Sequence, residues 1–215
     1  MRAVHMRTDY LKEPVGLGNP TPRLYWKCEG GVAQSAYQVI AEKDGEQIWD
    51  SGKVSSSSST HISYGGPYPG SRERIDWKVR LWDEKDEPGE WSGSFFEMGL
   101  LLAGDWKAKW ISGNYRPKKN TRYPVDCFRK TFTAGKRVKR AVLYMSACGL
   151  YRGWIDGKPV SDAVFMPGAT DYRKRIPYQT YDVTELLRKE EGESGSHTLD
   201  IWLADGWYRG SIGCF

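Results

Sequence analysis

Two short stretches in the second half of the chain carry the kinds of side chain that bind sugars. Aromatic faces cover the apolar C–H side of a pyranose ring, and carboxylate and guanidinium groups form paired hydrogen bonds with its hydroxyls. The stretches GATDYRKR and LADGWYRG combine both kinds, in Asp171, Tyr172, Arg173, Arg175, Asp205, Trp207, Tyr208 and Arg209. They predict a surface that contacts either a carbohydrate or a neighbouring domain.

A purely structural role stays open for both stretches. For the first, the alternative is a loop with exposed charges. For the second, it is a β-bulge or strand-end loop in which Trp207 fills a seam between domains. The pairs Asp205-Gly206 and Arg209-Gly210 favour a tightly turned backbone at the end of a strand. Such loops gather at the rim of a β-sandwich, where binding surfaces usually lie.

No residue is predicted to be catalytic. Two acidic clusters, within 84–87 and 190–193, lie where hairpins need soluble turn residues, with no apolar segment nearby to raise the pKa of one carboxyl. The three histidines, His5, His61 and His197, are far apart in the sequence and accompany no nucleophile motif. The acidic clusters are therefore interpreted as solvated turns.

Neither a metal ion nor a cofactor is predicted. The four cysteines, Cys28, Cys127, Cys148 and Cys214, occur singly, without the paired spacing or nearby histidines of a zinc site. The acidic residues form no calcium-binding motif. Free thiols fit a reducing cytoplasm, and the amino terminus has no apolar signal segment, so a cytoplasmic location is expected.

Composition predicts a folded chain without a nucleic-acid or membrane partner. The 215 residues are 27% charged and 13% aromatic, and no apolar run approaches the roughly 18 residues of a spanning helix. The net charge is +5, but acidic and basic residues are interleaved except in YRPKKNTRY (115–123) and TAGKRVKRA (133–141). Both segments are interpreted as loops between strands.

Short segments rich in β-branched and aromatic residues predict an all-β chain. Turn residues separate them at intervals of roughly 8–12 residues, which is typical of a two-sheet sandwich. In the first half, strands are expected at 23–28, 35–42, 46–50, 59–63, 74–83 and 93–98. The expected core residues alternate along these strands and are Trp26, Tyr37, Val39, Trp77, Val79 and Leu81.

The second half predicts another antiparallel sandwich, of jelly-roll type. The Asp-Gly pair in YRGWIDGKPV indicates a hairpin, DVTELL a short helical turn, and HTLDIWLAD a central strand with Leu199, Ile201 and Leu203 on one face. The expected boundaries are a fibronectin type III-like sandwich at 1–99, a linker at 100–112 and the jelly roll at 113–215.

An ordered set of motifs resembles the amino-terminal region of the bacterial α-L-rhamnosidases. It comprises NPTPRLYWK, WDSGKV, WKVRLWD, DWKAKWI, AVLYMSACGLYRGWIDGKPV, YQTYDVTELL and LADGWYRG, and it covers nearly the whole chain. Single strings such as DGKPV recur in the accessory sandwiches of many glycoside hydrolases. The order and spacing of the set therefore carry the resemblance.

The resemblance implies a non-catalytic part of an inverting glycoside hydrolase that releases terminal α-L-rhamnose. In that family an (α/α)6 catalytic barrel follows the sandwiches in the same polypeptide, and this chain lacks the amphipathic helices of such a barrel. The implied partners are that barrel and a rhamnose-containing glycan or glycoside. LADGWYRG is then expected to face the barrel, where it closes the substrate pocket or holds the domains together.

Two other functions stay open from the sequence. One is a stand-alone carbohydrate-binding or adhesion module, and the other is the accessory region of a different glycosidase, such as a β-galactosidase or glucuronidase relative. The jelly roll is also expected to be incomplete at its carboxyl-terminal end. Trp207, Ile212 and Phe215 would then lack partners, which favours self-association of the chain.

Overall fold

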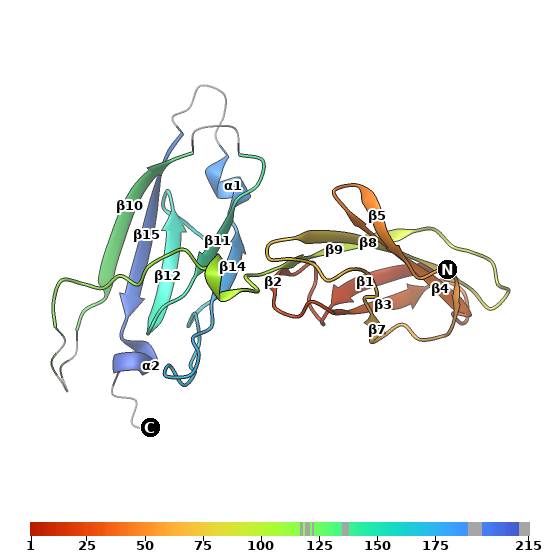
Figure 1. Cartoon of the computed structure of the whole chain (residues 1–215), viewed down its shortest axis with the longest axis horizontal. Coiled ribbons are helices and arrows are strands. Elements are labelled where there is room, and N and C mark those ends of the chain that lie inside the picture. Colours follow the sequence, from red (N-terminus) through yellow and green to blue (C-terminus); the bar gives the residue numbers. More distant parts are fainter. Residues whose placement is uncertain (117, 119–120, 122, 135–137, 189–194, 211–215) are drawn as a thin grey trace. The chain divides into compact units, whose positions relative to one another are not determined.

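The chain folds into two compact units, Met1–Ala108 and Lys109–Phe215 (Figure 1). The division falls within the segment 100–112. The computed structural model describes all residues except 117, 119–120, 122, 135–137, 189–194 and 211–215. The acidic cluster at 190–193 and the residues Ile212, Cys214 and Phe215 therefore lie outside the described residues.

Unit 1 is a sandwich of a three-stranded and a six-stranded sheet. Its elements are β1 (Arg2–Thr8), β2 (Val15–Leu17), β3 (Arg23–Glu29), β4 (Ala36–Lys43), β5 (Glu46–Asp50), β6 (Val54–Ser55), β7 (Ile62–Ser63), β8 (Arg74–Trp82), β9 (Ser92–Met98) and the 3-10 helix η1 (Ala103–Asp105). The smaller sheet has the order β1-β3-β7. The larger has the order β2-β9-β8-β4-β5, with β6 also pairing with β4.

The core of unit 1 lies between these sheets and follows the predicted alternation. Val39 of β4 pairs with Val79 of β8, and neither side chain is exposed to solvent. Trp26 reaches the core from the opposite sheet, where its ring meets Tyr37 edge to face with centroids 5.4 Å apart. Its indole Nε1 donates a hydrogen bond to Gln34 Oε1 at 3.0 Å, so the buried polar atom is satisfied. All six expected core residues are buried, which confirms that prediction.

Unit 2 also contains two sheets. Its elements are β10 (Asp126–Thr133), β11 (Val142–Met145), β12 (Leu150–Ile155), β13 (Lys158–Pro159), β14 (Gln179–Asp182), α1 (Thr184–Leu187), β15 (Ser196–Ala204) and α2 (Gly206–Arg209). The four-stranded sheet has the order β10-β15-β12-β13, and β11 pairs with β14. The described chain is thus nearly all β, as predicted.

Local signals in unit 2 agree with the predicted elements. β15 is the central strand, because it pairs antiparallel with both β10 and β12. The β12–β13 hairpin turns at Asp156 and Gly157, whose φ angles of 49° and 77° suit the tight turn that Asp-Gly favours. Helix α1 begins at Thr184, whose backbone N–H is bound by Asp182 Oδ1 at 3.0 Å.

The segment after β15 is a helical turn rather than the β-bulge or strand-end loop that the structural alternative described. The backbone N–H groups of Tyr208 and Arg209 donate to the carbonyl of Asp205 at 3.1 and 3.2 Å. Gly206 has φ of +50°, which redirects the chain from the extended strand into the turn. The tight turning that the glycines predict is present, but it is used to begin helix α2.

Substitution of Leu81 by alanine should destabilise unit 1. Leu81 is fully buried in the core, so Leu81→Ala should lower the free energy of unfolding by about 3 kcal/mol through lost burial and the cavity left behind. Denaturant unfolding followed by tryptophan fluorescence measures this change. Val32→Ala is the matched control, because Val32 is 87% exposed. Equal effects of the two substitutions would contradict the assigned core.

Candidate functional site

Two glycines allow α2 to lie against the four-stranded sheet. Gly149 has φ of +125°, and a Cβ there would lie 2.3 Å from the carbonyl oxygen of Ala204. At Gly206 a Cβ would lie 2.6 Å from Leu150 Cγ. A larger residue at either position would push apart the start of β12 and the end of β15. The backbone approach at this corner therefore fixes where the side chains of α2 can point.

Arg209 of α2 joins two carboxylates and a tyrosine. Its Nη2 atom lies 2.8 Å from Asp205 Oδ1 and 3.7 Å from Asp126 Oδ2. The Tyr115 hydroxyl donates to Asp126 Oδ2 at 3.0 Å and accepts from Arg209 at 3.4 Å. The Arg209, Asp205 and Asp126 side chains are at most one quarter exposed, so solvent screens the network only in part. Burial opposes the charge of Arg209, yet the hydroxyl of Tyr115 and the two carboxylates raise its pKa overall.

The two predicted stretches meet through their aromatic rings. Tyr172 and Tyr208 pack edge to face with centroids 5.1 Å apart, and Trp207 lies 6.2 Å from the ring of Phe165. Burial raises the pKa of Tyr172, whereas Tyr208 is 51% exposed. The structure therefore brings Tyr172 to the α2 side chains, with the exposed part of Tyr208 available to a partner.

Asp171 and Arg175 do not join this cluster through any described side-chain bond. Asp171 accepts from the Nε and backbone N–H of Arg173 at 3.0 and 3.1 Å, and Arg173 holds its pKa below the usual range. The carbonyl of Asp171 also accepts from the backbone of Lys174 and Arg175. These bonds build a local turn, which favours the structural interpretation for this pair.

A cavity of about 540 Å³ lies beside Asp126 of this network. Its described lining is Tyr115, Arg116, Lys118, Thr121, Tyr123, Pro124 and Asp126. The rings of Tyr115 and Tyr123 stack with centroids 5.1 Å apart. The sequence interpretation of 115–123 as a solvated basic loop missed these aromatic residues. The signal available in the sequence was a tyrosine at each end of the basic segment.

An aromatic pair on the four-stranded sheet, with Trp202 exposed and Trp154 partly buried, was also missed. Trp154 of β12 and Trp202 of β15 have ring centroids 4.7 Å apart, and Arg152 lies over the Trp154 ring at 5.6 Å. Nearby, Arg129 binds both carboxylate oxygens of Asp200, at 2.6 and 3.1 Å. Trp202 is 52% exposed. Its position between inward-facing Ile201 and Leu203 is the sequence signal that it points outward.

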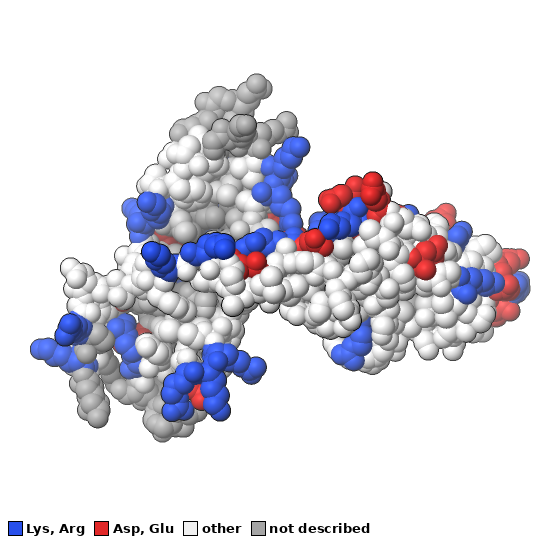
Figure 2. Space-filling model, viewed as in Figure 1, with Lys and Arg blue, Asp and Glu red and all other residues white. Residues whose placement is uncertain are grey.

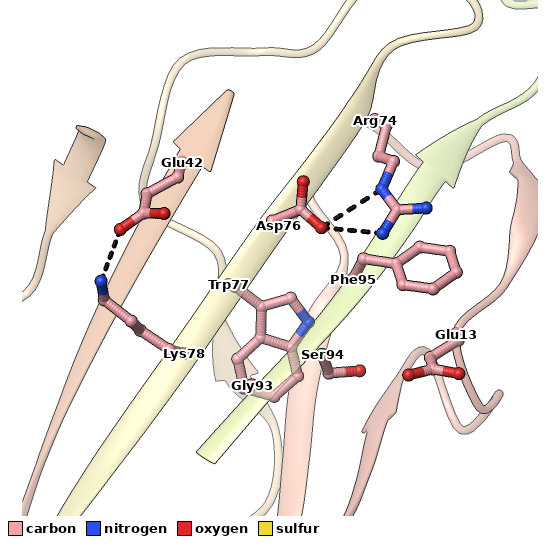
Figure 3. A pocket seen from close by; sticks show the side chains of 9 residues that line it. All are labelled: Glu13, Glu42, Arg74, Asp76, Trp77, Lys78, Gly93, Ser94 and Phe95. Atoms are coloured by element: carbon pink, nitrogen blue, oxygen red, sulfur yellow. Dashed lines mark hydrogen bonds and ion pairs between the residues drawn. The ribbon is translucent and has the colours of Figure 1, made fainter. Parts of the chain in front are cut away.

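A second pocket lies on the outer face of the larger sheet in unit 1 (Figure 3). Two of its carboxylates are held by cations: Asp76 accepts from Arg74 at 2.9 Å, and Glu42 pairs with Lys78. The Arg74 guanidinium also lies 3.6 Å from the ring centroid of Phe95. Glu13 lies across the pocket from these pairs (Figure 3). Glu42–Lys78 joins two neighbouring strands and Arg74–Asp76 lies within β8, so both carboxylates are paired with cations rather than placed in an apolar pocket as a general acid requires.

The acidic cluster at 84–87 lies in a turn, as predicted. Glu84 accepts from the backbone N–H groups of Val32 and Ala33, at 3.0 and 3.3 Å, and these bonds hold its pKa below the usual range. Asp86 pairs with Lys53. Both carboxylates therefore connect neighbouring loops of unit 1.

The distribution of charge differs between the two units. On the visible face of unit 1, acidic and basic groups are mixed, whereas Lys and Arg predominate on that of unit 2 (Figure 2). Among the described residues, no three of His, Cys, Asp and Glu are grouped so as to hold a metal ion. Cys28, Cys127 and Cys148 are free thiols. No helix in the described part of the chain has the length and apolar character needed to cross a membrane.

Models of known protein families match both units. The family model described as "Rha78A-like, N-terminal immunoglobulin domain" matches residues 3–102, and "Alpha-L-rhamnosidase N-terminal domain" matches residues 136–215. An immunoglobulin domain and a fibronectin type III domain share the sandwich architecture that unit 1 has.

Individual relatives match nearly the whole chain. An α-L-rhamnosidase of Formosa agariphila is 38% identical over 96% of this chain, which corresponds to 23% of that protein. The solved α-L-rhamnosidase of Dictyoglumus thermophilum is 32% identical with a TM-score of 0.82, and covers 99% of this chain and 26% of its own. That of Aspergillus terreus is 28% identical with a TM-score of 0.87, covering 99% and 25%. The chain thus spans about a quarter of these relatives.

Alanine at Gly149 should destabilise unit 2 more than alanine at Gly157. Both glycines have positive φ, but a Cβ at Gly157 would have no atom within 4 Å. Gly157→Ala should cost about 1 kcal/mol from backbone strain, and Gly149→Ala about 3 kcal/mol because of the added clash with Ala204. Urea unfolding of both variants measures the difference. Equal costs would show that the close approach at the α2 corner is not required.

Proposed function

The chain belongs to the α-L-rhamnosidase family, as its amino-terminal accessory region, and we propose that it serves an enzyme that releases terminal α-L-rhamnose from glycans or glycosides. The observation that carries the proposal is the pattern of matching. Relatives named as α-L-rhamnosidases match 93% or more of this chain, and in the Formosa agariphila and Dictyoglumus thermophilum proteins the match covers about a quarter of their own length. The remaining three quarters of such an enzyme then supplies the catalytic domain.

The arrangement of the carboxyl groups indicates that catalysis takes place in another part of the enzyme. Inverting hydrolysis needs one protonated and one ionised carboxyl, roughly 6.5–9.5 Å apart with room for a water between them. Asp126 and Asp205 instead share the guanidinium of Arg209, and Asp76 is held by Arg74. We therefore assign the reaction to an (α/α)6 barrel in the same polypeptide, acting on a rhamnose-containing glycan or glycoside.

Helix α2 is proposed as the surface of unit 2 that meets the catalytic domain. Its backbone is fixed by Gly149 and Gly206, and its side chains are held by the Arg209 network. Tyr208 nevertheless exposes half of its surface. A rigid and partly exposed aromatic side chain loses little conformational entropy on binding, so it suits an interface. Sugar contact by Trp207 or Tyr208 then depends on the neighbouring domain.

A stand-alone carbohydrate-binding module is the second candidate, and one observation favours it. Exposed Trp202 and partly buried Trp154 form an aromatic platform flanked by Arg152 and by the Arg129–Asp200 pair. Such a platform has the chemistry of a sugar site by itself. This candidate does not require any catalytic domain.

The 215-residue chain alone should not hydrolyse an aryl α-L-rhamnoside. Release of the aryl alcohol should equal the buffer blank, because the carboxylates of the Arg209 network and of the unit 1 pocket are held by cations, while the Dictyoglumus thermophilum enzyme serves as a positive control. Turnover by this chain that disappears in Asp126→Asn or Asp205→Asn would contradict the proposal.

Binding of rhamnose by the chain separates the two candidates. The stand-alone module requires binding that is lost in Trp202→Ala and kept in Trp110→Ala, a matched control because Trp110 is 64% exposed in the same unit. The accessory-region proposal predicts no measurable binding to this platform and equal behaviour of the two variants in calorimetric titrations.

A further inference from the structure

The outer face of the three-stranded sheet in unit 1 carries a buried tyrosine. Neighbouring residues of β3 alternate between faces, and Leu24 and Trp26 enter the core. Tyr25 therefore points away from the core, where solvent exposure is expected. It is nevertheless only 7% exposed. Something other than the sandwich core must cover it.

Tyr10 and His61 cover Tyr25 from loops far apart in the sequence. Their ring centroids lie 4.6 and 5.1 Å from that of Tyr25. The Tyr10 hydroxyl and His61 Nε2 are hydrogen bonded at 2.9 Å. Both residues have left-handed backbones, with φ of 69° and 57°, as does His5 with 51°. Residues other than glycine rarely adopt this conformation, and such strain gathers at functional sites.

A groove of about 240 Å³ opens beside this aromatic cluster. The pairing of β1 with β3 is interrupted between Val4 and Arg7, which makes room for it. Its lining is His5, Arg7, Tyr10, Tyr25, Trp26, Lys27 and Thr60. An interruption of this kind changes the direction in which side chains point and is common next to binding sites.

The residues that line the groove include cations but no acidic residue. Arg7 and Lys27 are cationic, none of the lining residues is acidic, and neither cation forms an ion pair with any described residue. Asp9 and Glu29, each two residues along the chain from one of these cations, are bound by other groups: Asp9 accepts from the backbone N–H of Arg23 and from Asn19, and Glu29 pairs with Arg2. The groove lining therefore carries positive charge, and the carboxylate that acts on its Tyr25, that of Asp9, is already engaged by Arg23 and Asn19.

The Tyr25 hydroxyl adds a donor that interacts only weakly with Tyr10. Its oxygen is buried and lacks a hydrogen bond of normal geometry, and the side chain that interacts with it is that of Tyr10, which is a costly arrangement for a polar group. Burial, and to a smaller extent a hydrogen bond with the Tyr10 side chain, raises the pKa of Tyr25 to about 12, so the hydroxyl stays protonated at neutral pH. Tyr10 is 61% exposed, so its ring can be displaced to give Tyr25 an acceptor.

We propose that this groove binds the anionic group of an acidic sugar residue, a carboxylate or a sulfate ester. Arg7 and Lys27 bind the anion, Tyr25 donates to it once Tyr10 has moved, and the Tyr10 ring packs against the sugar. The choice of a sugar rests on the proposed function of the chain. The preference for an anion rests on the groove alone.

Titrations followed by ¹H–¹⁵N NMR test the site on the whole chain. The probes are glucuronate, glucose 6-sulfate, neutral rhamnose and inorganic sulfate. At least one of the two acidic sugars should shift the amide signals of Tyr10, Tyr25 and Lys27, and 0.5 M NaCl should weaken the binding. Selectivity between them identifies the anion as carboxylate or sulfate. Binding is read without any hydrolysis, so failure here is distinct from failure of the proposed function.

Variants assign the effect to the groove. Arg7→Gln should weaken binding about tenfold through loss of a charge-assisted hydrogen bond, whereas Lys85→Gln, an exposed lysine of the same unit, should leave it unchanged. Tyr25→Phe should also weaken binding while leaving or raising the melting temperature, because it removes a buried hydroxyl that lacks a hydrogen bond of normal geometry.

Several results would overturn the site. These are binding of rhamnose as tight as that of the acidic sugars, equal effects of Arg7→Gln and Lys85→Gln, or signal shifts elsewhere than around the groove. Binding of inorganic sulfate as tight as that of the sugars would remove the role assigned to the Tyr10 ring. No binding of either acidic sugar would refute the proposal as a whole.

Discussion

The antiparallel pairing of β15 on both of its edges is the interaction on which unit 2 depends. β15 pairs with β10 from Leu203–Asp126 to Ser196–Thr133, and with β12 from Ala204–Leu150 to Leu199–Ile155. This register decides which side chains face the core and which face outward. It also brings Asp126, at the start of β10, to the end of β15, where α2 begins.

The same register explains why one end of unit 2 collects polar and aromatic side chains. Arg209 reaches Asp126 because the β10–β15 ladder places the two strand ends together. Trp202 meets Trp154 because they lie on neighbouring strands with outward-facing side chains. A shift of one residue in β15 would turn Trp202 into the core and Ile201 out of it. The α2 network and the tryptophan platform are thus two consequences of one pairing.

Local patterns in the sequence were enough to predict the core and the turns, because they depend on near neighbours. Alternation predicted that Val79 and Leu81 are buried, and the Asp156-Gly157 pair predicted its hairpin. The contacts between distant segments were not predictable in this way. Trp154 meets Trp202 only through strand register, and Tyr25 is buried by residues remote in sequence. Helix α2 was missed because four residues are too few for a helical period.

The predicted site was recovered in part for the same reason. Asp205 and Arg209 are one helical turn apart, so their ion pair follows from local structure once α2 is known. Tyr172 joins them only through the fold of the intervening chain, and Asp171 turns to its neighbour Arg173 instead. Composition suggested the chemistry of these stretches, whereas the tertiary structure decided which members act together.

Exchange of this chain into a related enzyme tests the assignment of an accessory role most directly. The chain would replace the matching region of the Dictyoglumus thermophilum α-L-rhamnosidase, with which it shares a TM-score of 0.82. Residual activity after heating would be compared with that of the same enzyme lacking the region. The account predicts that the chimera keeps its activity longer, and that Trp207→Ala with Tyr208→Ala removes this gain. A folded chimera whose residual activity after heating is no higher than that of the truncated enzyme would contradict the accessory role.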